Sequence, residues 1–528
     1  MCADSLHKRP AADGPAVTDA GLAAPHGEPA GPEREPAAAP GRDAPDAPAR
    51  DAASAPTGDA ARLINPAIRA YMDTLSLQRF YGGYVIAPLP EQILNLGIGE
   101  VGGIELPEEL AALHRRFVAG HDLTGLSTRY VGTLGIPETN AAMAEWVNAW
   151  LGERRFGPDS VVSLDGGQNA MEVAIRTFTA PLGSGRGRPY VLLAVPAYPY
   201  FSMIVAAQAG IQALLAYDAE QLTLGIERAC NPAVGLILIN APHNPMGYLP
   251  SAQQVERINR VARAYDCAIA VDMVYASFAP AGAGRALAGL DPERTVFVDS
   301  FSKKYGLPGF RLGFALSARP ELTYALRFVK TAESLTPSSP NLAFAGWLLR
   351  EHGDVPGRIG RAVRERCERF LESFGAERAP GVSFLGERSN PFYLALDIGS
   401  LVARTGLNDV QITQFLQARH RVRVYPGSFV YPSTALRAAT FAGYGAGYGA
   451  RGPHGAGGSH GSAGLRGSAG LPFVPPTVPD GAPIVYAPEL AGERVPMLRL
   501  SFGSEPRVEP AARALAAGLR ALWDGARE

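Results

Sequence analysis

The part of the sequence richest in reactive side chains is residues 300–313, which read Ser-Phe-Ser-Lys-Lys-Tyr-Gly-Leu-Pro-Gly-Phe-Arg-Leu-Gly. This stretch closely follows an apolar run at 295–298 and combines two serines, two lysines and an arginine with glycines. Hydroxyl, ammonium and guanidinium groups all donate hydrogen bonds to phosphate oxygens, so the stretch could bind a phosphate. A basic turn on the surface would have the same composition. Taken alone, the stretch leaves both interpretations open.

Other polar side chains stand where apolar runs end. Asp272 and Tyr275 follow the run 268–271, and Asn244 lies in the motif 240–247, which follows the run 234–239. Ligands of α/β proteins bind at the carboxyl ends of such strands. We therefore expect these side chains to lie in one site.

Residues 165–170, Asp-Gly-Gly-Gln-Asn-Ala, precede a predicted helix at 171–178. A helix start that carries glycines exposes free N–H groups and the positive end of the helix dipole, and so favours an anion. Near the end of the chain, Arg499 stands in an otherwise apolar run at 497–502. A buried guanidinium is costly without a partner, so we expect Arg499 to meet a carboxylate.

The elements that must hold these residues follow from the hydrophobic pattern. Between 123 and 349, helical patterns alternate with apolar runs such as 190–195, and a helix is predicted at 252–265. This alternation is typical of a mostly parallel sheet covered on both faces. We predict an α/β large domain at 116–349 and a smaller α+β domain at 350–528, which begins with a charged helix at 358–374 and is completed by residues 61–115.

Two segments differ from this folded core. Residues 1–58 are mostly Ala, Pro, Gly and charged residues and cannot bury enough apolar area, so we predict a disordered tail. Residues 441–483 are rich in Gly and then in Pro. We favour a solvated insertion, and a lid over the site is the alternative.

Composition excludes several classes of function. The 528 residues contain 49 Lys and Arg against 50 Asp and Glu, so no bulk charge attracts nucleic acid or an anionic membrane. No apolar run reaches the roughly 18 residues of a membrane span. The 4 cysteines are far apart and indicate neither a disulfide framework nor a metal site. The N-terminus shows no signal pattern, and we expect a cytoplasmic protein.

The motifs together, in their order from residue 95 to Arg499, resemble those of the class I/II aminotransferases, which are fold-type I pyridoxal phosphate (PLP) enzymes. The resemblance covers roughly 400 residues, and the ordered set is far more specific than any single motif. It implies an aspartate-aminotransferase-like α/β fold, PLP as cofactor, an amino acid and a 2-oxo acid as substrates, and a homodimer.

The resemblance also implies the catalytic residues. Lys303 matches the lysine that forms the Schiff base with PLP; its neighbour Lys304 fits the family spacing less well, because the arginine of the motif stands eight positions after Lys303. Asp272 matches the carboxylate that pairs with the pyridinium nitrogen and keeps the ring electron-poor. Tyr275 and Asn244 match the groups that hydrogen-bond the phenolic oxygen of the ring.

The remaining matches bind the cofactor's phosphate, its ring face and the substrate carboxylate. Tyr198 matches the aromatic residue stacked on the ring, and Tyr130 matches a tyrosine that reaches the phosphate of the neighbouring subunit. The phosphate-binding matches are Gly167, Gln168, Asn169, Ser300 and Arg311. The matches that hold the substrate α-carboxylate are Gly97, Asn244 and Arg499.

Other roles stay open at this point. The same scaffold hosts β- and γ-lyases, cyclopropane-forming synthases and oxidases, and a PLP-binding regulator is a further alternative, although residues 1–58 contain no helix-turn-helix pattern. We expect His243 to serve in packing. Tyr81, Tyr84 and Tyr200 are candidate pocket residues.

Overall fold

The computed structural model describes residues 90–102, 106–128, 130–181, 184, 187–201, 209–431, 484–486 and 494–525. The tail at 1–58, the candidate pocket residues Tyr81 and Tyr84, and the Gly-rich segment at 441–483 lie outside the described residues.

The main element is an eight-stranded sheet with the order β13-β4-β3-β5-β6-β7-β8-β2. Neighbours from β13 to β7 pair in parallel, whereas β8 is antiparallel to both β7 and β2. The predicted α/β fold with a mostly parallel sheet is confirmed. The strands are β2 (Val161–Leu164), β3 (Tyr190–Val195), β4 (Gly210–Leu215), β5 (Val234–Asn240), β6 (Ala268–Asp272), β7 (Thr295–Ser300), β8 (Gly313–Leu316) and β13 (Ile484–Tyr486).

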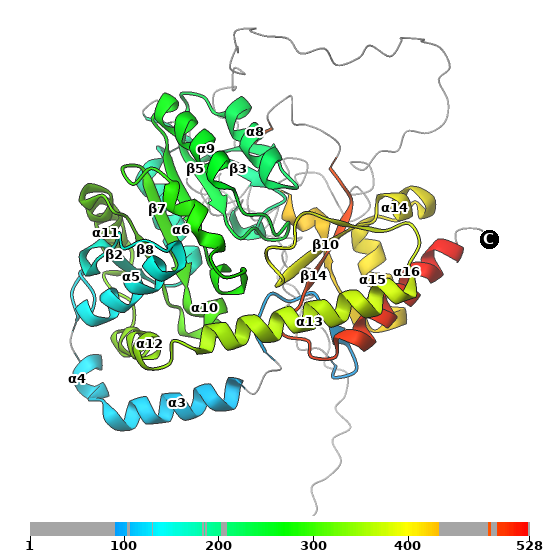
Figure 1. Cartoon of the computed structure of the whole chain (residues 1–528), viewed down its shortest axis with the longest axis horizontal. Helices are drawn as coiled ribbons and strands as arrows, with labels where there is room; N and C mark the ends of the chain where they lie inside the picture. Colours follow the sequence, from blue (N-terminus) through cyan, green and yellow to red (C-terminus); the bar gives the residue numbers. More distant parts are fainter. Residues whose placement is uncertain are drawn as a thin grey trace, which may run out of the picture. The chain divides into compact units, whose positions relative to one another are not determined.

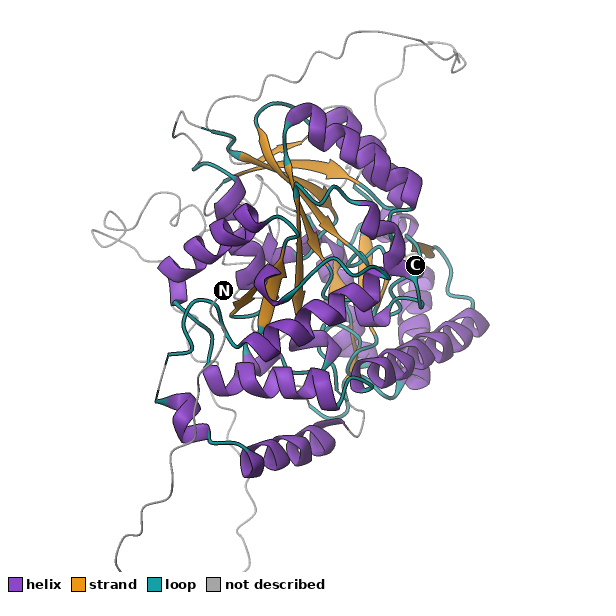
Figure 2. Ribbon diagram, turned by 60° about the vertical axis from the view of Figure 1, so that its left-hand side comes forward, coloured by secondary structure: helices purple, strands orange, loops and turns teal. Residues whose placement is uncertain are grey.

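Helices lie on both sides of this sheet (Figure 2). In α9 (Ala252–Tyr265), Ser251 caps the first turn, and Val255, Ile258 and Ala262 repeat at helical spacing on the buried face. The others along this part of the chain are α3 (Leu106–Gly120), α4 (Leu123–Ser127), α5 (Pro137–Leu151), α6 (Gly167–Phe178), α8 (Ala219–Ala229), α10 (Phe301–Lys304), α11 (Pro320–Ser334) and α12 (Ser339–Glu351). Short 3₁₀ helices are η2 (Pro158–Ser160), η3 (Ala276–Phe278), η4 (Ala283–Gly289), η5 (Pro308–Phe310) and η6 (Gly427–Val430).

A second, antiparallel sheet has the order β12-β14-β10-β9, and a separate parallel pair joins β1 to β11. The long helix α13 packs along α16 and also contacts α10 and η3 (Figure 1). Its residues therefore connect the lysine-bearing segment with the C-terminal helix. These elements are β1 (Leu94–Asn95), β9 (Ser383–Leu385), β10 (Tyr393–Asp397), β11 (Val422–Arg423), β12 (Tyr425–Pro426), β14 (Met497–Ser501), α13 (Val355–Glu377), α14 (Gly399–Thr405), α15 (Asp409–His420) and α16 (Val508–Gly525).

One strand lies where the sequence did not predict it. The range 350–528 was expected to form the smaller domain, yet β13 from this range pairs in parallel with β4 at the edge of the large sheet. An unpaired edge of β4 would leave backbone groups open, and β13 satisfies part of them. The domain boundaries at 116 and 350 stay a prediction.

The predicted elements differ from the observed ones mainly at their ends. Helix α6 starts at Gly167, four residues before the predicted start, because Gly166 turns the chain with φ 99°, which favours glycine. Strands β5, β6 and β7 each extend beyond the predicted runs and end at Asn240, Asp272 and Ser300. The polar residues are thus the last residues of the strands themselves.

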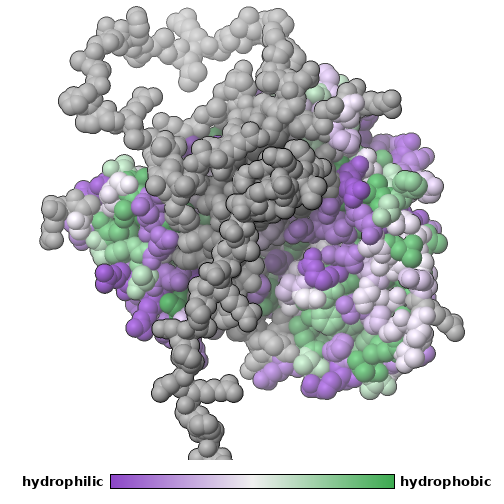
Figure 3. All heavy atoms as spheres, turned by 180° about the vertical axis from the view of Figure 1, so that it is seen from behind, coloured by the Kyte–Doolittle hydropathy of each residue, from purple (hydrophilic) through white to green (hydrophobic). Residues whose placement is uncertain are grey.

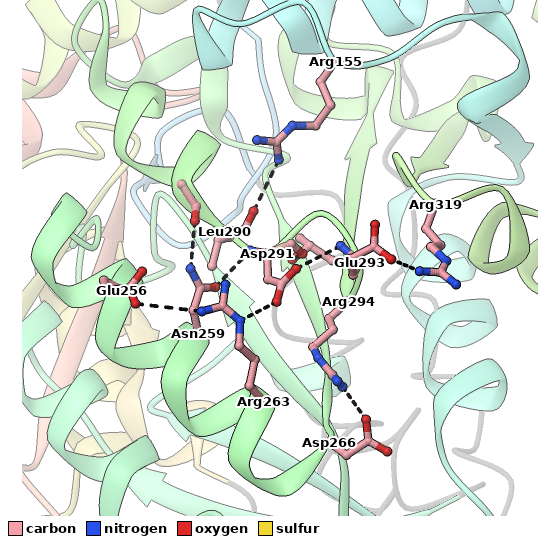
Figure 4. Close-up of polar contacts among 12 residues, drawn as sticks. Arg155, Glu256, Asn259, Arg263, Asp266, Leu290, Asp291, Glu293, Arg294 and Arg319 are labelled. Atoms are coloured by element: carbon pink, nitrogen blue, oxygen red, sulfur yellow. Dashed lines mark hydrogen bonds and ion pairs between the residues drawn. The ribbon is translucent and has the colours of Figure 1, made fainter.

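Polar contacts hold the N-terminal ends of β6 and β7 in place (Figure 4). The Asp291 carboxylate accepts a hydrogen bond from Arg263 Nε at 2.7 Å, and the Asp291 N–H donates to Asn259 Oδ1 at 2.9 Å. Arg294 pairs with Asp266 at 2.5 Å. Because Arg263 and Asp266 are largely exposed, these ion pairs stabilise the fold only modestly.

The described surface is mixed in character. Hydrophilic and hydrophobic residues are interspersed on the face seen in Figure 3. Among the helices of the described ranges, none combines the length and the apolar character that crossing a bilayer requires.

Candidate active site

The carboxyl edge of the large sheet is the edge at which β5, β6 and β7 end. In the register, Asn240 pairs with Asp272, and Ser300 pairs with Gly313. Strand β2 runs in the same direction as β7, because both are antiparallel to β8. The start of α6, which follows β2, therefore lies at this same edge, where α/β folds bind ligands.

The start of α6 is a stretch of bare backbone at the carboxyl edge. A Cβ on Gly313 would lie 2.5 Å from the carbonyl carbon of Gly166 and 2.7 Å from the Gly167 nitrogen. A Cβ on Gly167 would lie 3.2 Å from Cβ of Ser300. The free N–H groups of the helix start are thus brought beside the Ser300 hydroxyl, a combination that suits a phosphate.

Arg311 lies beside the same helix start. Its Nη2 donates to the Asp165 carbonyl at 3.2 Å and its Nη1 donates to the Pro308 carbonyl at 3.1 Å. The guanidinium therefore lies at the loop that begins α6, as the phosphate role requires.

Two predicted phosphate residues are less well engaged by their side chains. Gln168 is exposed, and Asn169 Nδ2 donates to Glu333 Oε2 of α11 at 3.0 Å. The Asn169 side chain is thus engaged with α11, while that of Gln168 faces solvent. The phosphate-binding role of both residues stays a prediction.

A buried carboxyl and an amine lie within electrostatic reach of each other at the carboxyl edge. Burial raises the pKa of Asp272 to about 7, with Asp299 adding to the rise and Lys303 opposing it. Burial lowers the pKa of the Lys303 ammonium to about 8; Arg499 also lowers it, while Glu100 and Asp272 raise it. Both groups can therefore change protonation near neutral pH, which is typical of catalytic groups.

The two adjacent lysines lie in different surroundings. Lys303 Nζ donates to the Gly99 carbonyl, whereas Lys304 Nζ forms a buried ion pair with Asp299 and lies 4.4 Å from the centroid of the Trp146 ring. Trp146 Nε1 also donates to Asp299, at 2.9 Å. The structure thus supports Lys303 over Lys304 as the reactive amine.

Asn244 and Tyr275 are brought together as predicted. Asn244 Nδ2 donates to the Tyr275 hydroxyl at 3.5 Å, and the Asn244 N–H donates to Asn240 Oδ1 at 2.7 Å. Asn244 Oδ1 is buried and has no hydrogen-bond partner among the described residues. Such an atom is costly unless a ligand supplies a donor, so it marks the space a ligand fills.

Arg499 and Gly97 are also in contact. Arg499 Nη2 donates to the Gly97 carbonyl at 3.2 Å, and the guanidinium lies 3.9 Å from the centroid of the Tyr425 ring and 4.6 Å from that of Tyr393. The sequence predicts a carboxylate partner for Arg499, and its contacts in the structure include a carbonyl and two aromatic faces. A substrate carboxylate at Arg499 stays a prediction.

The predicted aromatic residues differ in their exposure. Tyr198 is half-buried and packs with Tyr200 and Phe201 at ring-centroid distances of 5.2 and 5.4 Å. Tyr130 is 84% exposed in the single chain. An exposed side chain is free to contact a neighbouring subunit, so the role of Tyr130 stays a prediction.

His243 has the surroundings of a packed, neutral side chain. Its Nδ1 accepts from the Met246 N–H at 3.2 Å and its ring stacks on Tyr248 at 4.1 Å. Burial lowers the pKa of His243 to about 3. A histidine that stays neutral at physiological pH fits the expected packing role.

One residue of the site was missed by the sequence. The Tyr393 hydroxyl, from β10, lies 2.9 Å from the Tyr275 hydroxyl. No motif surrounds Tyr393, and it reaches the site only because the second sheet packs against the carboxyl edge. Its place depends on tertiary structure alone.

These features fit PLP. The start of α6, together with Ser300 and Arg311, suits the phosphate of PLP. Burial raises the pKa of the Asp272 carboxyl, and a protonated ring nitrogen of PLP would supply the positive charge that favours its ionised form. The unpartnered Asn244 Oδ1 and the Tyr275 hydroxyl lie together at a further polar position.

Comparison with known families identifies the class of protein. The family model described as "Aminotransferase class I and II" matches residues 91–445. The chain belongs to this family, whose enzymes use PLP and transfer amino groups.

Several aminotransferases are similar to this chain. The aspartate aminotransferase of Thermotoga maritima is 24% identical over 343 residues, which cover 64% of this chain and 84% of that protein. A crystal structure of aspartate aminotransferase from Thermotoga maritima has a TM-score of 0.58 at 17% identity and covers 86% of this chain and 96% of that one. The aromatic aminotransferase of Pyrococcus horikoshii has a TM-score of 0.60 at 17% identity, covering 86% and 99%. The solved structures establish the shared fold.

Proposed function

We propose that this protein binds PLP through a Schiff base at Lys303 and moves an amino group from an amino acid to a 2-oxo acid. The observation that carries the proposal is the difference in surroundings between the two adjacent lysines. Lys303 reaches the carboxyl edge with an ammonium pKa of about 8, while Lys304 is paired with Asp299 in the core. A lysine with a lowered pKa is available as a free amine, the form that attacks a carbonyl.

When bound, PLP supplies a ring that accepts electrons from the substrate α-carbon. Asp272 holds the proton at the ring nitrogen, and Tyr275 with Asn244 hydrogen-bonds the ring oxygen. Arg499 and Gly97 orient the α-carboxylate, which fixes the direction of the α C–H bond.

Lys303 Nζ carries the proton to and from the substrate α-carbon. Its amine must be neutral to accept that proton, and an ammonium pKa of about 8 leaves a substantial neutral fraction near physiological pH. Arg499 and Arg311 favour the neutral amine electrostatically, since both lower the pKa of the ammonium.

The proposal includes a homodimer in which Tyr130 reaches the phosphate held by the neighbouring subunit. The exposure of Tyr130, at 84%, supports this role. The cytoplasmic location stays a prediction.

The first test maps the covalent attachment. The protein is incubated with PLP, reduced with borohydride and digested, and the modified peptide is identified by mass spectrometry. We expect the adduct on Lys303, and its loss in Lys303→Ala. An adduct on Lys304, or full two-substrate exchange at the wild-type rate by Lys303→Ala, contradicts the proposal.

The second part of this test concerns the reaction class. An amino acid added without an acceptor is expected to convert bound PLP to pyridoxamine phosphate, with one equivalent of 2-oxo acid. Release of ammonia with PLP unchanged identifies an eliminating lyase instead.

A further inference from the structure

Two tyrosine hydroxyls from different sheets meet at the carboxyl edge. Tyr275 follows β6 of the large sheet and Tyr393 begins β10 of the second sheet; their hydroxyl oxygens are 2.9 Å apart. Both side chains are buried, with 4% and 2% of their surface exposed. A hydrogen bond between two buried hydroxyls is shielded from competing water, so it holds both groups in one geometry.

Tyr393 also contacts the carboxylate-binding arginine. The register pairs Ala395 with Arg499 and Tyr393 with Ser501, so Tyr393 and Arg499 lie on one face of the second sheet. The Arg499 guanidinium lies 4.6 Å from the centroid of the Tyr393 ring. The ring of Tyr393 thus supports Arg499 while its hydroxyl reaches Tyr275.

The segment that receives Lys303 is packed against the same hydroxyl. A Cβ on Gly99 would overlap the Tyr393 hydroxyl, and the Gly99 carbonyl accepts the hydrogen bond from Lys303 Nζ. Tyr393 therefore contacts three parts of the site: Tyr275, which is proposed to bind the ring oxygen of PLP; Arg499, which is proposed to bind the substrate carboxylate; and the backbone beside the Lys303 amine.

The contacts of the Tyr275 hydroxyl determine where its own proton can point. A phenol hydroxyl has two acceptor lone pairs and one proton. Asn244 Nδ2 donates to one lone pair, at 3.5 Å. If Tyr393 donates to the other, the only direction left for the Tyr275 proton is toward the ligand.

We propose that Tyr393 is a positioning residue whose hydroxyl donates to Tyr275 and directs the Tyr275 proton at the phenolic oxygen of PLP. This inference rests on the proposed function, since it assigns Tyr393 a role toward the cofactor at Lys303. The charged groups that act on this pair are Asp272, which faces Tyr275, and Arg499, which faces both tyrosines. Around the neighbouring Lys303 ammonium the charged groups are Glu100, Asp272, Arg311 and Arg499.

The test replaces a single oxygen atom. Tyr393→Phe keeps the ring beneath Arg499 and removes the donor to Tyr275. A weaker hydrogen bond to the phenolic oxygen disfavours its ionised form, so the pH midpoint at which bound PLP changes its absorbance should rise by about 0.5–1 unit, the worth of one hydrogen bond. In steady state, kcat should fall several-fold while KM stays within about twofold, because the carboxylate site is intact.

A double-mutant cycle shows whether Tyr393 acts through Tyr275. In the Tyr275→Phe background, Tyr393→Phe should move the midpoint no further. Tyr425→Phe is the matched control, since the Tyr425 ring also lies against Arg499. Made alone in the wild-type protein, it should not change the pH midpoint of the PLP absorbance. Tyr393→Leu removes the ring as well and should raise KM in addition.

Each outcome decides between the two proposals. A Tyr393→Phe midpoint equal to that of the wild type, or a full additional shift in the Tyr275→Phe background, overturns the role of Tyr393. Wild-type protein that shows no PLP absorbance band and no borohydride-trapped adduct overturns the proposed function itself.

Discussion

The Asp272 carboxyl shows how one residue can be costly to the empty protein and necessary to the loaded one. It is buried at the end of β6, accepts a hydrogen bond from the Val274 N–H at 3.2 Å, and has a pKa raised to about 7. The protonated form is therefore favoured in the folded chain. A cationic ring nitrogen nearby restores the ionised form, because an opposite charge lowers the pKa of a carboxyl.

Asp272→Asn should separate these two effects. A carboxyl whose pKa is raised on folding contributes full stability below its unfolded value of about 3.8 and loses it as the pH rises through about 7. At pH 8, PLP-free Asp272→Asn should thus have a free energy of unfolding a few kcal/mol greater than that of the wild type, and so a higher melting temperature. At pH 4 the two proteins should melt at the same temperature. With PLP, kcat should fall by roughly 10²–10⁴-fold, because an amide does not keep the ring nitrogen protonated.

Thermal melts at the two pH values and steady-state kinetics check this prediction. Asp266→Asn is the control, since Asp266 is exposed and its pKa is lowered by Arg294 and Arg188; it should give no gain at pH 8. An equal change in melting temperature at pH 4 and pH 8 contradicts the account of Asp272.

At the scale of elements, the close approach of β8 to the start of α6 shapes the proposed phosphate-binding site. Gly313 pairs with both Leu164 and Ser300, the last residues of the strands on either side of it. It thereby brings the turn after β2 and the turn after β7, which carry the proposed phosphate-binding residues, close together. The approach is possible only without a side chain at position 313.

Gly313→Ala should push the start of α6 away from Ser300. The added Cβ meets backbone atoms, which cannot move aside as a flexible side chain can. We expect a loss of about 1–3 kcal/mol in stability and a tenfold or greater rise in the Kd for PLP. Fluorescence titration and thermal melts measure both.

The matched control is Gly309→Ala in η5, shortly before β8, where a Cβ would meet nothing within 4 Å. Equal PLP affinity in the two variants would contradict the proposed importance of this close approach.

Local pattern predicted the strands and helices around the site closely, and tertiary pairing explains what it missed. The helix at 252–265 and the strand at 190–195 have the predicted bounds, because their apolar spacing and flanking residues specify them locally. The pairing of β13 with β4 and the contact of Tyr393 with Tyr275 join residues more than 100 positions apart. No local pattern encodes such contacts.

At the scale of the whole molecule, several large apolar side chains of the single chain are exposed. Tyr324 and Phe328 of α11 are 68% and 69% exposed, and Leu134 and Tyr130 are 59% and 84% exposed. Residues four apart share one face of a helix, so the two aromatics of α11 form a continuous apolar surface. Such a surface on a folded protein indicates a protein partner, which supports the proposed homodimer.

Phe328→Glu should weaken the dimer. A carboxylate buried in an apolar interface is unfavourable, so we expect a shift to monomer at micromolar concentration and a several-fold loss of PLP affinity if Tyr130 crosses between subunits. Sedimentation velocity with PLP titration measures both. Gln253→Glu on the exposed side of α9 adds the same charge and should change neither. A Phe328→Glu protein that sediments like the wild type would exclude α11 from the interface.

The pairing of Lys304 with Asp299 limits the mutational paths open to this protein. Two neighbouring lysines suggest redundancy, as though the loss of one could be compensated by the next. Moving the Lys304 ammonium out of the interior would leave the Asp299 carboxylate buried beside Trp146 without its cationic partner, which is strongly unfavourable. Lys304 therefore cannot replace Lys303 in the folded chain, although the two lysines are neighbours in the sequence.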